Sequence, residues 1–410
     1  MVSACSSLTR GCTVAALAWD EVPVGGIDLP ARRLEMVWGF GSGLTRRADD
    51  PPGRVWAIGD RGPNLKAGVA IEMYGLDAVA RHAAVEGTKV MPRVDIGPAL
   101  AELQVDSDRV TLRRVLPLLG VNGAPATGLP PPGSEHALKE PAVDLAGRII
   151  APDPGGVDSE GVVALPCGGF VIADEYGPSL IRLDAEARIV ERLVPKGSAE
   201  SFAGAGYPIR DTLPAIAAKR RLNRGFEGVA MGGDGRLLVA FQSPLADPDE
   251  KASKHAEHVR LWSIDLDAGI VAGEYLYRFE QPETFRRDMN AKRGDRKLSE
   301  ITALADGSFL VLERVSRSTK FFRVTLDGAG ETVDDGKPGL EKRSGKEEAL
   351  RSVEKTLFLD TDDHSEIAAD LEGATILSPT ELLLVNDNDF GCEGAVTRFW
   401  RVTFDMPVFG

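Results

Sequence analysis

The chain lacks long apolar runs, closely spaced cysteines and an excess of basic residues. No apolar run approaches the ~18 residues of a membrane-spanning helix, so no transmembrane segment is expected. The four cysteines, Cys5, Cys12, Cys167 and Cys392, have no zinc-knuckle spacing. The formal net charge of −14 and the pI of about 5.0 argue against nucleic acid as a partner, because binding it requires a positive face.

Several catalytic motifs are also missing. The sequence contains no GxSxG nucleophile elbow, no P-loop and no dinucleotide-binding fingerprint. The 5 histidines are scattered along the chain. The sequence therefore shows no motif for a serine triad, and the scattered histidines disfavour histidine-based acid–base catalysis.

The N-terminal residues leave the localisation open. They lack the charged and apolar regions of a complete signal peptide. Residues 2–5, Val-Ser-Ala-Cys, resemble the end of a bacterial lipoprotein signal without the apolar part before it. We expect a periplasmic protein or a lipoprotein if the start is truncated, and a cytoplasmic protein otherwise.

What the chain does contain is a recurring phrase. An acid precedes a short apolar strand, a Gly/Asp turn and a second strand in the copies DSEGVVAL, GFEGVAM, LSEITAL and DLEGATIL. Their acids are spaced by 67, 73 and 72 residues, and a diverged copy lies at residues 42–64. The four acids are Glu160, Glu227, Glu300 and Glu372. Spaced self-similarity of this kind indicates a repeat architecture.

Each copy predicts four antiparallel strands. Short β-branched and aromatic runs separated by Gly-containing turns are typical of hairpins, and radial repetition of four such strands is typical of a propeller. We therefore predict an all-β fold, a single-domain β-propeller of five or six four-stranded blades over residues 39–410. Inserted loops are expected near 122–141 and 328–355. The N-terminal segment 1–38 is expected to donate a ring-closing strand, from 13–19 or from 34–38.

The first strand of a blade starts at one mouth of a propeller, and the antiparallel second strand ends at the same mouth. The charged residues at the predicted second-strand ends are Asp60, Arg61, Asp174, Glu175, Glu313, Arg314, Asp387 and Asp389. We therefore expect many carboxylates around one funnel. Two positions depart from this pattern, because Leu44 lies at the first strand start and Gln242 at the third second-strand end.

Carboxylates gathered this closely repel one another and would have to bind protons at neutral pH. A hard divalent cation resolves the repulsion, and Ca²⁺ suits an irregular site of roughly six to eight oxygens better than Mg²⁺ does. Alternatively, each acid could cap a strand end by accepting backbone N–H bonds. We predict Ca²⁺ as the cofactor, with these metal ligands: Asp60, Asp174, Glu175, Glu313, Glu372, Asp387 and Asp389.

The repeated phrases, with GDRGPN near the front and LPLLGVNGAPATGLP ending at residue 130, resemble the phytase-like family, described by its esterase-like activity of phytase. The resemblance covers residues 40–405 and implies a bacterial β-propeller related to Ca²⁺-dependent propeller phytases, which use clustered calcium ions to bind phosphate and activate water. It also implies these shared mouth residues: Glu160, Asp174, Glu175, Glu227, Glu300, Glu313, Glu372, Asp387 and Asp389.

The first hypothesis for function is a Ca²⁺-dependent hydrolase of phosphate esters, with a small anionic, phosphorylated substrate as the partner. The predicted catalytic residues are Glu160, Glu227 and Glu300, one of which would act as general base. The predicted substrate-binding residues are Arg61, Arg224 and Arg314, because a guanidinium can hold an oxyanion with two hydrogen bonds. The basic run within 286–297 precedes Glu300 and could also attract an anionic substrate. The alternatives are a non-catalytic calcium-stabilised binding propeller and a metal-dependent lactonase or esterase.

Overall fold

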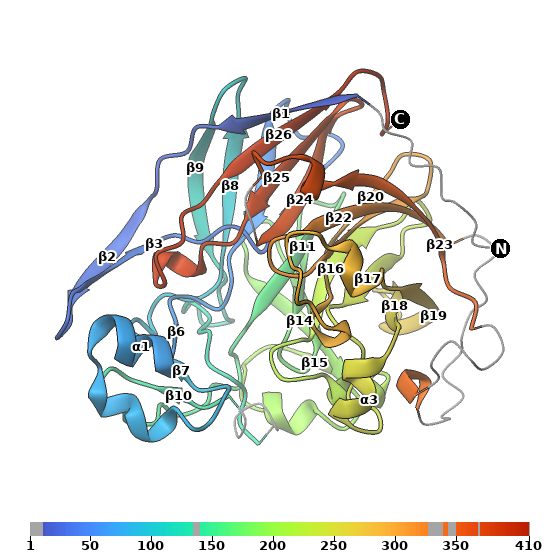
Figure 1. Ribbon diagram of the computed structural model, residues 1–410. Coiled ribbons are helices and arrows are strands. Elements are labelled where there is room, and N and C mark those ends of the chain that lie inside the picture. The colour runs from blue at the N-terminus through green and yellow to red at the C-terminus, as the bar shows by residue number, and fades with distance from the viewer. Residues whose placement is uncertain (1–10, 134–139, 327–338, 343–349, 368–369, 410) are drawn as a thin grey trace. The chain divides into compact units, whose positions relative to one another are not determined.

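Figure 1 shows a computed structural model of the chain. The chain divides into two compact units. Unit 1 comprises Met1–Ala18, Lys219–Asn386 and Arg398–Gly410, and unit 2 comprises Trp19–Ala218 and Asp387–Thr397. The structure describes residues 11–133, 140–326, 339–342, 350–367 and 370–409. The lipoprotein-like residues 2–5 and parts of the loops predicted at 122–141 and 328–355 lie outside the described residues.

Antiparallel sheets dominate both units, and this confirms the all-β prediction. The described helices are few: α1 (Ala67–Tyr74), α3 (Glu250–His255) and short 3₁₀ turns such as η1 (Asp77–His82) and η8 (Asp389–Gly391). Across the described residues, no helix is both long enough and apolar enough to cross a membrane.

The described residues of unit 2 form two large sheets and two small ones. The first large sheet is formed by β4 (Gly43–Thr45), β5 (Arg54–Ile58), β8 (Ala99–Val105) and β9 (Val110–Pro117). The second is formed by β11 (Ser159–Ala164), β12 (Phe170–Asp174), β13 (Ser179–Leu183), β14 (Ile189–Pro195) and the parallel strand β15 (Ile209–Leu213). The small sheets are β2 (Pro23–Asp28) with β3 (Arg33–Val37), and β6 (Leu65–Lys66) with β7 (Lys89–Val90) and β10 (Ala142–Val143).

Three four-stranded sheets lie in the described part of unit 1. The first is formed by β16 (Phe226–Met231), β17 (Leu237–Phe241), β18 (His258–Asp265) and β19 (Ile270–Arg278). The second is formed by β20 (Lys297–Ala303), β21 (Phe309–Arg314), β22 (Thr319–Thr325) and β23 (Glu354–Asp360). The third is formed by β24 (Leu371–Ser378), β25 (Glu381–Asn386), β26 (Phe399–Phe404) and β1 (Cys12–Leu17).

The N-terminal strand β1 completes the last sheet by pairing antiparallel with β26, from Cys12 opposite Phe404 to Leu17 opposite Phe399. The other candidate segment, 34–38, instead overlaps β3, which pairs with β2. Between Pro117 and Ser159 the described residues contain one named strand, the short β10, so they form no sixth four-stranded sheet there. Closure of a ring and the blade count stay predictions.

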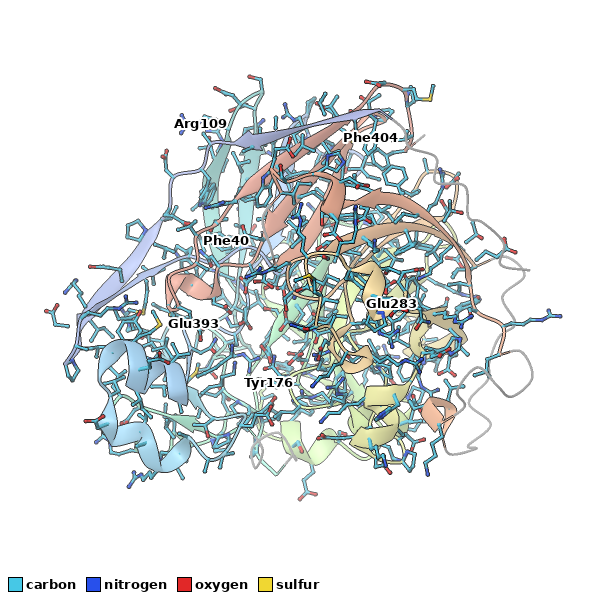
Figure 2. The ribbon with its side chains drawn as sticks, in the orientation of Figure 1. Phe40, Arg109, Tyr176, Glu283, Glu393 and Phe404 are labelled. Atoms are coloured by element: carbon cyan, nitrogen blue, oxygen red, sulfur yellow. The ribbon has the colours of Figure 1, made fainter. Side chains whose placement is uncertain are left out.

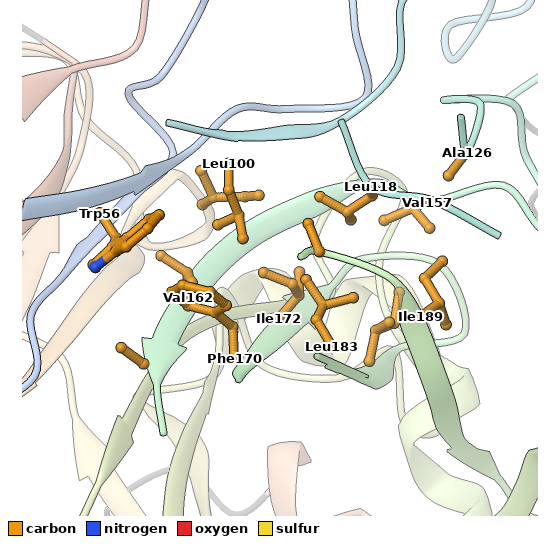
Figure 3. Packing of buried hydrophobic residues seen from close by; sticks show 14 of the residues in the cluster. Trp56, Leu100, Leu118, Ala126, Val157, Val162, Phe170, Ile172, Leu183 and Ile189 are labelled. Atoms are coloured by element: carbon orange, nitrogen blue, oxygen red, sulfur yellow. The ribbon is translucent and has the colours of Figure 1, made fainter. Parts of the chain in front are cut away.

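The strands that begin with the repeated acids pack face to face within unit 1. Strand β16 contacts β20, and β20 contacts β24. In unit 2, β11 likewise contacts β4 and β5. Between the sheets lie apolar side chains, such as Trp56 and Phe170, whose rings meet edge-on at 5.0 Å between centroids (Figure 3). This packing fixes the position of each strand start.

Each repeated phrase also carries a β-bulge at its strand start. The register shifts between Ser159 and Gly161, between Phe226 and Val229, between Leu298 and Glu300, and between Leu371 and Gly373. Three of the repeated acids lie inside these shifts and Glu300 lies at the edge of one. A bulge adds a residue to one strand and re-aims its side chain, so the repeat specifies where the acids point as well as where they occur.

Candidate functional site

Three acids come together in unit 2 from two neighbouring sheets. Asp60 follows β5, Asp158 precedes β11, and Glu160 lies in the bulge of β11. One carboxylate oxygen from each of the three lies within 4.8 Å of one from each of the others. We call this group the acid triad. Its spacing suits a single cation held by oxygen ligands.

Asp158 is the most unusual member of the acid triad. Its side chain is fully buried, and neither of its carboxylate oxygens accepts a hydrogen bond from a described residue. Arg61 Nη2 lies 2.7 Å from Asp158 Oδ2, but this contact lacks hydrogen-bond alignment and is a contact between charges. A buried carboxylate that accepts no hydrogen bond is costly in free energy, so the oxygens of Asp158 are suited to bind a cation.

Two members of the acid triad, Asp158 and Asp60, have pKa values shifted in opposite directions. Burial, aided by the charges of Asp60 and Glu175, raises the pKa of Asp158 well above its usual range against the opposing charge of Arg61. Burial also acts to raise the pKa of Asp60, but Arg61 and the Asp158 carboxyl outweigh it, so the pKa of Asp60 is lowered. The pair therefore holds a proton where a cation would otherwise balance the charge.

Arg61 is held among these acids by its own surroundings. Its guanidinium lies 3.4 Å from Asp60 and donates from Nη1 to Tyr176 Oη at 3.3 Å (Tyr176 is labelled in Figure 2). Tyr176 in turn donates to the carbonyl of Gly128 at 3.0 Å. Gly62 has φ +108°, and a side chain there would collide with the carbonyl of Ile96, so the GDRGPN turn requires glycine.

Two further predicted ligands, Asp387 and Asp389, belong to the same electrostatic group in unit 2. Burial and the charges of Asp389 and Asp60 raise the pKa of Asp387 well above its usual range. Burial and Asp60 likewise raise the pKa of Asp389. Asn388 fixes this turn by accepting a bond from Phe390 N at 2.9 Å and donating to the carbonyl of Trp38 at 3.1 Å. These aspartates can therefore extend the acid triad.

The other two predicted ligands in unit 2 have protein partners. Asp174 Oδ1 accepts from Asp158 N at 2.7 Å, and Oδ2 accepts from Ser179 Oγ at 2.5 Å and from Arg192 Nη2. Glu175 Oε2 lies 3.9 Å from Arg61 Nη2. The Asp174 carboxylate thus ties the start of β11 to the rest of its own sheet, which disfavours it as a metal ligand.

In unit 1 the bulges place two predicted catalytic acids, Glu227 and Glu300, in buried positions. Glu300 Oε1 accepts from Ile301 N at 3.0 Å. Gly228 lets β16 approach β20 closely, because a Cβ there would lie 2.5 Å from Ile301 N. The two acids therefore lie on packed neighbouring strands of one unit.

The predicted substrate-binding residue Arg314 is already engaged. It donates from Nε to Ser299 Oγ at 2.8 Å, from Nη1 to Asp370 at 3.2 Å and from Nη2 to Glu372. The Arg61–Asp158 contact in unit 2 has the same form, since an arginine after a second strand meets an acid of the next repeat. Both arginines therefore tie neighbouring sheets together.

The remaining predicted residues of unit 1 are Arg224 and Glu313. Arg224 Nη1 donates to Ser243 Oγ at 2.7 Å. Glu313 is fully buried and accepts from Tyr277 Oη at 2.7 Å, from Lys355 Nζ at 3.1 Å and from Glu280 N at 2.7 Å. These three donors disfavour Glu313 as a metal ligand.

Sequence reasoning missed Asp158 and Lys89 as site residues. Asp158 is the first residue of the most complete copy of the repeat, and this position could have indicated that it belongs to the site. Lys89 lies on β7, and burial and Arg61 lower its pKa against the charges of Asp60, Asp158 and Asp389. No pattern in the sequence indicated that Lys89 would come near the acid triad, because it lies between the repeats.

Fold and site together define a class: an all-β protein built from repeated sheets of four or five strands, with buried acids at the strand starts. The chain matches the family described as Phytase-like, esterase-like activity of phytase, over residues 36–390, and it belongs to this family. The resemblance expected from the sequence is thus confirmed at the level of the family.

One named relative is similar to this chain in sequence, and its description gives no activity. An uncharacterized secreted protein of the fungus Arthroderma benhamiae is 26% identical over 352 residues, which cover 75% of this chain and 64% of that protein. The chain therefore spans less than two thirds of that relative's length.

Two solved structures are similar over nearly the whole chain. The PQQ-bound aldose sugar dehydrogenase of Streptomyces coelicolor has a TM-score of 0.37, 12% identity, and coverage of 96% and 98% of the two chains. The virginiamycin B lyase of Staphylococcus aureus has a TM-score of 0.30, 8% identity, and coverage of 96% and 99%. Likeness this remote carries no argument about this chain.

Proposed function

We propose that the protein is a Ca²⁺-dependent hydrolase of phosphate esters. Membership of the phytase-like family supports hydrolytic activity. The observation that carries the metal dependence is the buried Asp158 carboxylate, which has no hydrogen-bond donors among the described residues and lies beside Asp60 and Glu160. Oxygen ligands of this kind favour a hard cation, and Ca²⁺ accepts their irregular arrangement.

The residues that would hold Ca²⁺ are Asp60, Asp158 and Glu160, with Asp387 and Asp389 next to them. Bound there, Ca²⁺ would supply positive charge for phosphoryl oxygens and polarise the ester. Arg61 would keep Asp158 oriented and partly balanced, as its 2.7 Å contact suggests. Glu227 and Glu300 stay the proposed proton acceptors of unit 1, where burial suits a general base.

We further propose that the five large sheets are blades of one β-propeller with its mouth at the strand starts. The support is the repeat itself, with an acid at or beside a β-bulge at the start of four first strands, and the pairing of β1 with β26. The relative described as secreted supports export of this protein too.

The decisive experiment compares metal-stripped wild type with Asp158→Asn in the presence and absence of Ca²⁺. Wild type should gain about 2.7 kcal/mol of stability at a hundredfold excess of Ca²⁺ over its Kd and should hydrolyse a phosphomonoester or phosphodiester only with Ca²⁺. Asp158→Asn should lose both effects. Asp95→Asn, at an exposed ion pair with Arg93, is the matched control and should keep both.

Glu160→Gln serves as a second variant if Asp158→Asn fails to fold. Calcium stabilisation without hydrolysis of any phosphate ester, lactone or aryl ester would leave a calcium-stabilised binding protein. Hydrolysis of lactones or aryl esters alone would make the protein a metal-dependent esterase. No calcium effect in wild type would leave the acid triad as a structural group.

A further inference from the structure

A lysine at the start of β20 lacks the contacts expected of a charge at a partly buried position. Lys297 lies opposite Arg314 in the register of β20 and β21, so two cationic side chains leave neighbouring strands at the same level. Its ammonium group forms no ion pair or hydrogen bond with any described residue. Buried ammonium groups are normally paired, because an unpaired charge away from water is costly.

Three segments of unit 1 are tied together around this lysine. Arg224 donates from Nη1 to the carbonyl of Arg296, the residue before Lys297, at 3.3 Å. Leu298 N donates to the carbonyl of Gln242 at 3.0 Å. Oε1 of Gln242, a residue only 5% exposed, has no hydrogen-bond partner among the described residues. An amine and an amide oxygen without partners among the described residues thus lie in adjoining segments, and the amine is the one of the two that can pair with an oxyanion.

We propose that Lys297 is the anion-responsive residue of unit 1: a phosphate-like oxyanion binds beside Arg224 and Arg314 and forms the ion pair that the Lys297 amine lacks. This inference rests on the proposed function, because it names a residue of unit 1 that would take a phosphate-like group.

The charges that face Lys297 explain why its amine responds. Arg314, burial and Arg224 together lower the pKa of Lys297 to about 7, while Glu227 and Asp370 act in the opposite direction. Below about pH 7 the amine is already charged, so an oxyanion binds without proton uptake. Above that pH the amine is neutral in the unliganded protein, and binding must take up a proton as the anion raises the lysine pKa.

Calorimetric titration of metal-stripped protein with sulfate tests this directly, because sulfate does not titrate near neutral pH. In two buffers of different ionisation enthalpy at about pH 8, wild type should take up a fraction of one proton per sulfate bound. Its sulfate affinity should be constant below about pH 7 and fall about tenfold per pH unit above about pH 8. Phenyl phosphate in place of sulfate tests whether an ester occupies the same position.

Lys297→Met should abolish the proton uptake and flatten the pH dependence. The matched control is Lys254→Met, since Lys254 is 53% exposed and lies 3.4 Å from Glu250 in the same unit. That control should behave like wild type. If Lys297→Met does not fold, the pH dependence of sulfate binding to wild type still decides the question.

Three outcomes would overturn the inference: no sulfate or phenyl phosphate binding, binding without proton uptake above the lysine pKa, or unchanged uptake in Lys297→Met. Failure of the proposed function is a separate result, because these titrations contain no metal and measure no hydrolysis. An inactive protein that still shows Lys297-dependent proton uptake would retain the oxyanion site and lose only the hydrolase assignment.

Discussion

At the scale of single residues, the contacts of the charged groups distinguish residues that could bind a ligand from residues that link neighbouring sheets. Arg314 contacts Asp370 and Glu372 of the following repeat, and Arg61 contacts Asp158 in the same way. Asp370 is 60% exposed, whereas Asp158 is fully buried. Because Asp370 is exposed, water solvates its carboxylate beside Arg314. Asp158 is shielded from solvent, so its carboxylate keeps a desolvation cost that the contact with Arg61 only partly offsets.

Burial also makes one histidine a determinant of acid stability. His258 is 9% exposed at the start of β18 and lies opposite Arg278. Burial lowers its pKa, Arg278 and Arg296 lower it further, and Glu257 opposes them. Between this lowered folded pKa and the unfolded value of about 6.5, the unfolded chain binds more protons. The free energy of unfolding should therefore decrease as the pH falls below about 6.5.

We expect His258→Gln to reduce the decrease in the free energy of unfolding at acidic pH. Urea unfolding between about pH 5 and 7 measures this free energy. The control is His255→Gln, because His255 is exposed and its Nδ1 lies 2.8 Å from the carbonyl of Lys251. That variant should keep the wild-type slope. Equal slopes for wild type and His258→Gln would show that His258 titrates alike in the folded and unfolded chain.

At the scale of elements, the bulge at each strand start depends on close strand packing. Gly228 follows the bulged acid of β16, and a methyl group there would meet Ile301 N at 2.5 Å and the carbonyl carbon of Glu300 at 2.7 Å. Both contacts are with backbone atoms, which cannot rotate away. The glycine of the repeated phrase is therefore required by the distance between β16 and β20.

Gly228→Ala should destabilise the protein by about 1–3 kcal/mol, because overpacking forces the strands apart. Thermal unfolding measures the change, and activity should fall with it since Glu227 and Glu300 flank the contact. Gly233→Ala lies in the turn between β16 and β17, where a methyl group would have no atom within 4 Å, and should stay within about 0.5 kcal/mol of wild type. A stable Gly228→Ala would mean that β16 and β20 can separate without cost.

At the scale of the whole molecule, the two units divide the predicted site residues between them. The acid triad with Asp387 and Asp389 belongs to unit 2, whereas Glu227, Glu300 and Lys297 belong to unit 1. Calcium held by the acid triad should therefore act first on unit 2. The proposed metal binding and oxyanion binding can then be measured as separate events.

Hydrogen exchange with and without Ca²⁺ tests this division. We expect calcium to slow exchange of the amides at 58–62 and 157–161 in unit 2, because a ligand suppresses the local openings that break its site. Asp158→Asn should lose this protection. Protection confined to residues 224–243 and 297–301 would instead move the metal to the acids of unit 1.

The sequence by itself determined the class of the molecule. Alternating short strands and Gly-containing turns specify hairpins locally, so the all-β fold could be predicted, and the segment 13–19 predicted as a strand lies close to β1. The repeated phrase also specified the family and the recurrence of an acid at each strand start. These features depend on residues that lie close together in the sequence, so a single sequence is enough to recognise them.

Only the tertiary structure decided what each charged residue does. Asp158 and Asp370 occupy the same place in their repeats, two residues before the acid, yet one is buried in the acid triad and the other is exposed beside Arg314. The sequence predicted Asp174 and Glu313 as metal ligands, and their protein donors disfavour that role.

The two lysines show the same limit. Lys89 carried no signal in the sequence, and the basic run that ends at Lys297 did not indicate which of its members would lack a partner. Burial and partners come from segments distant in sequence, and these set the pKa and the role of a charge.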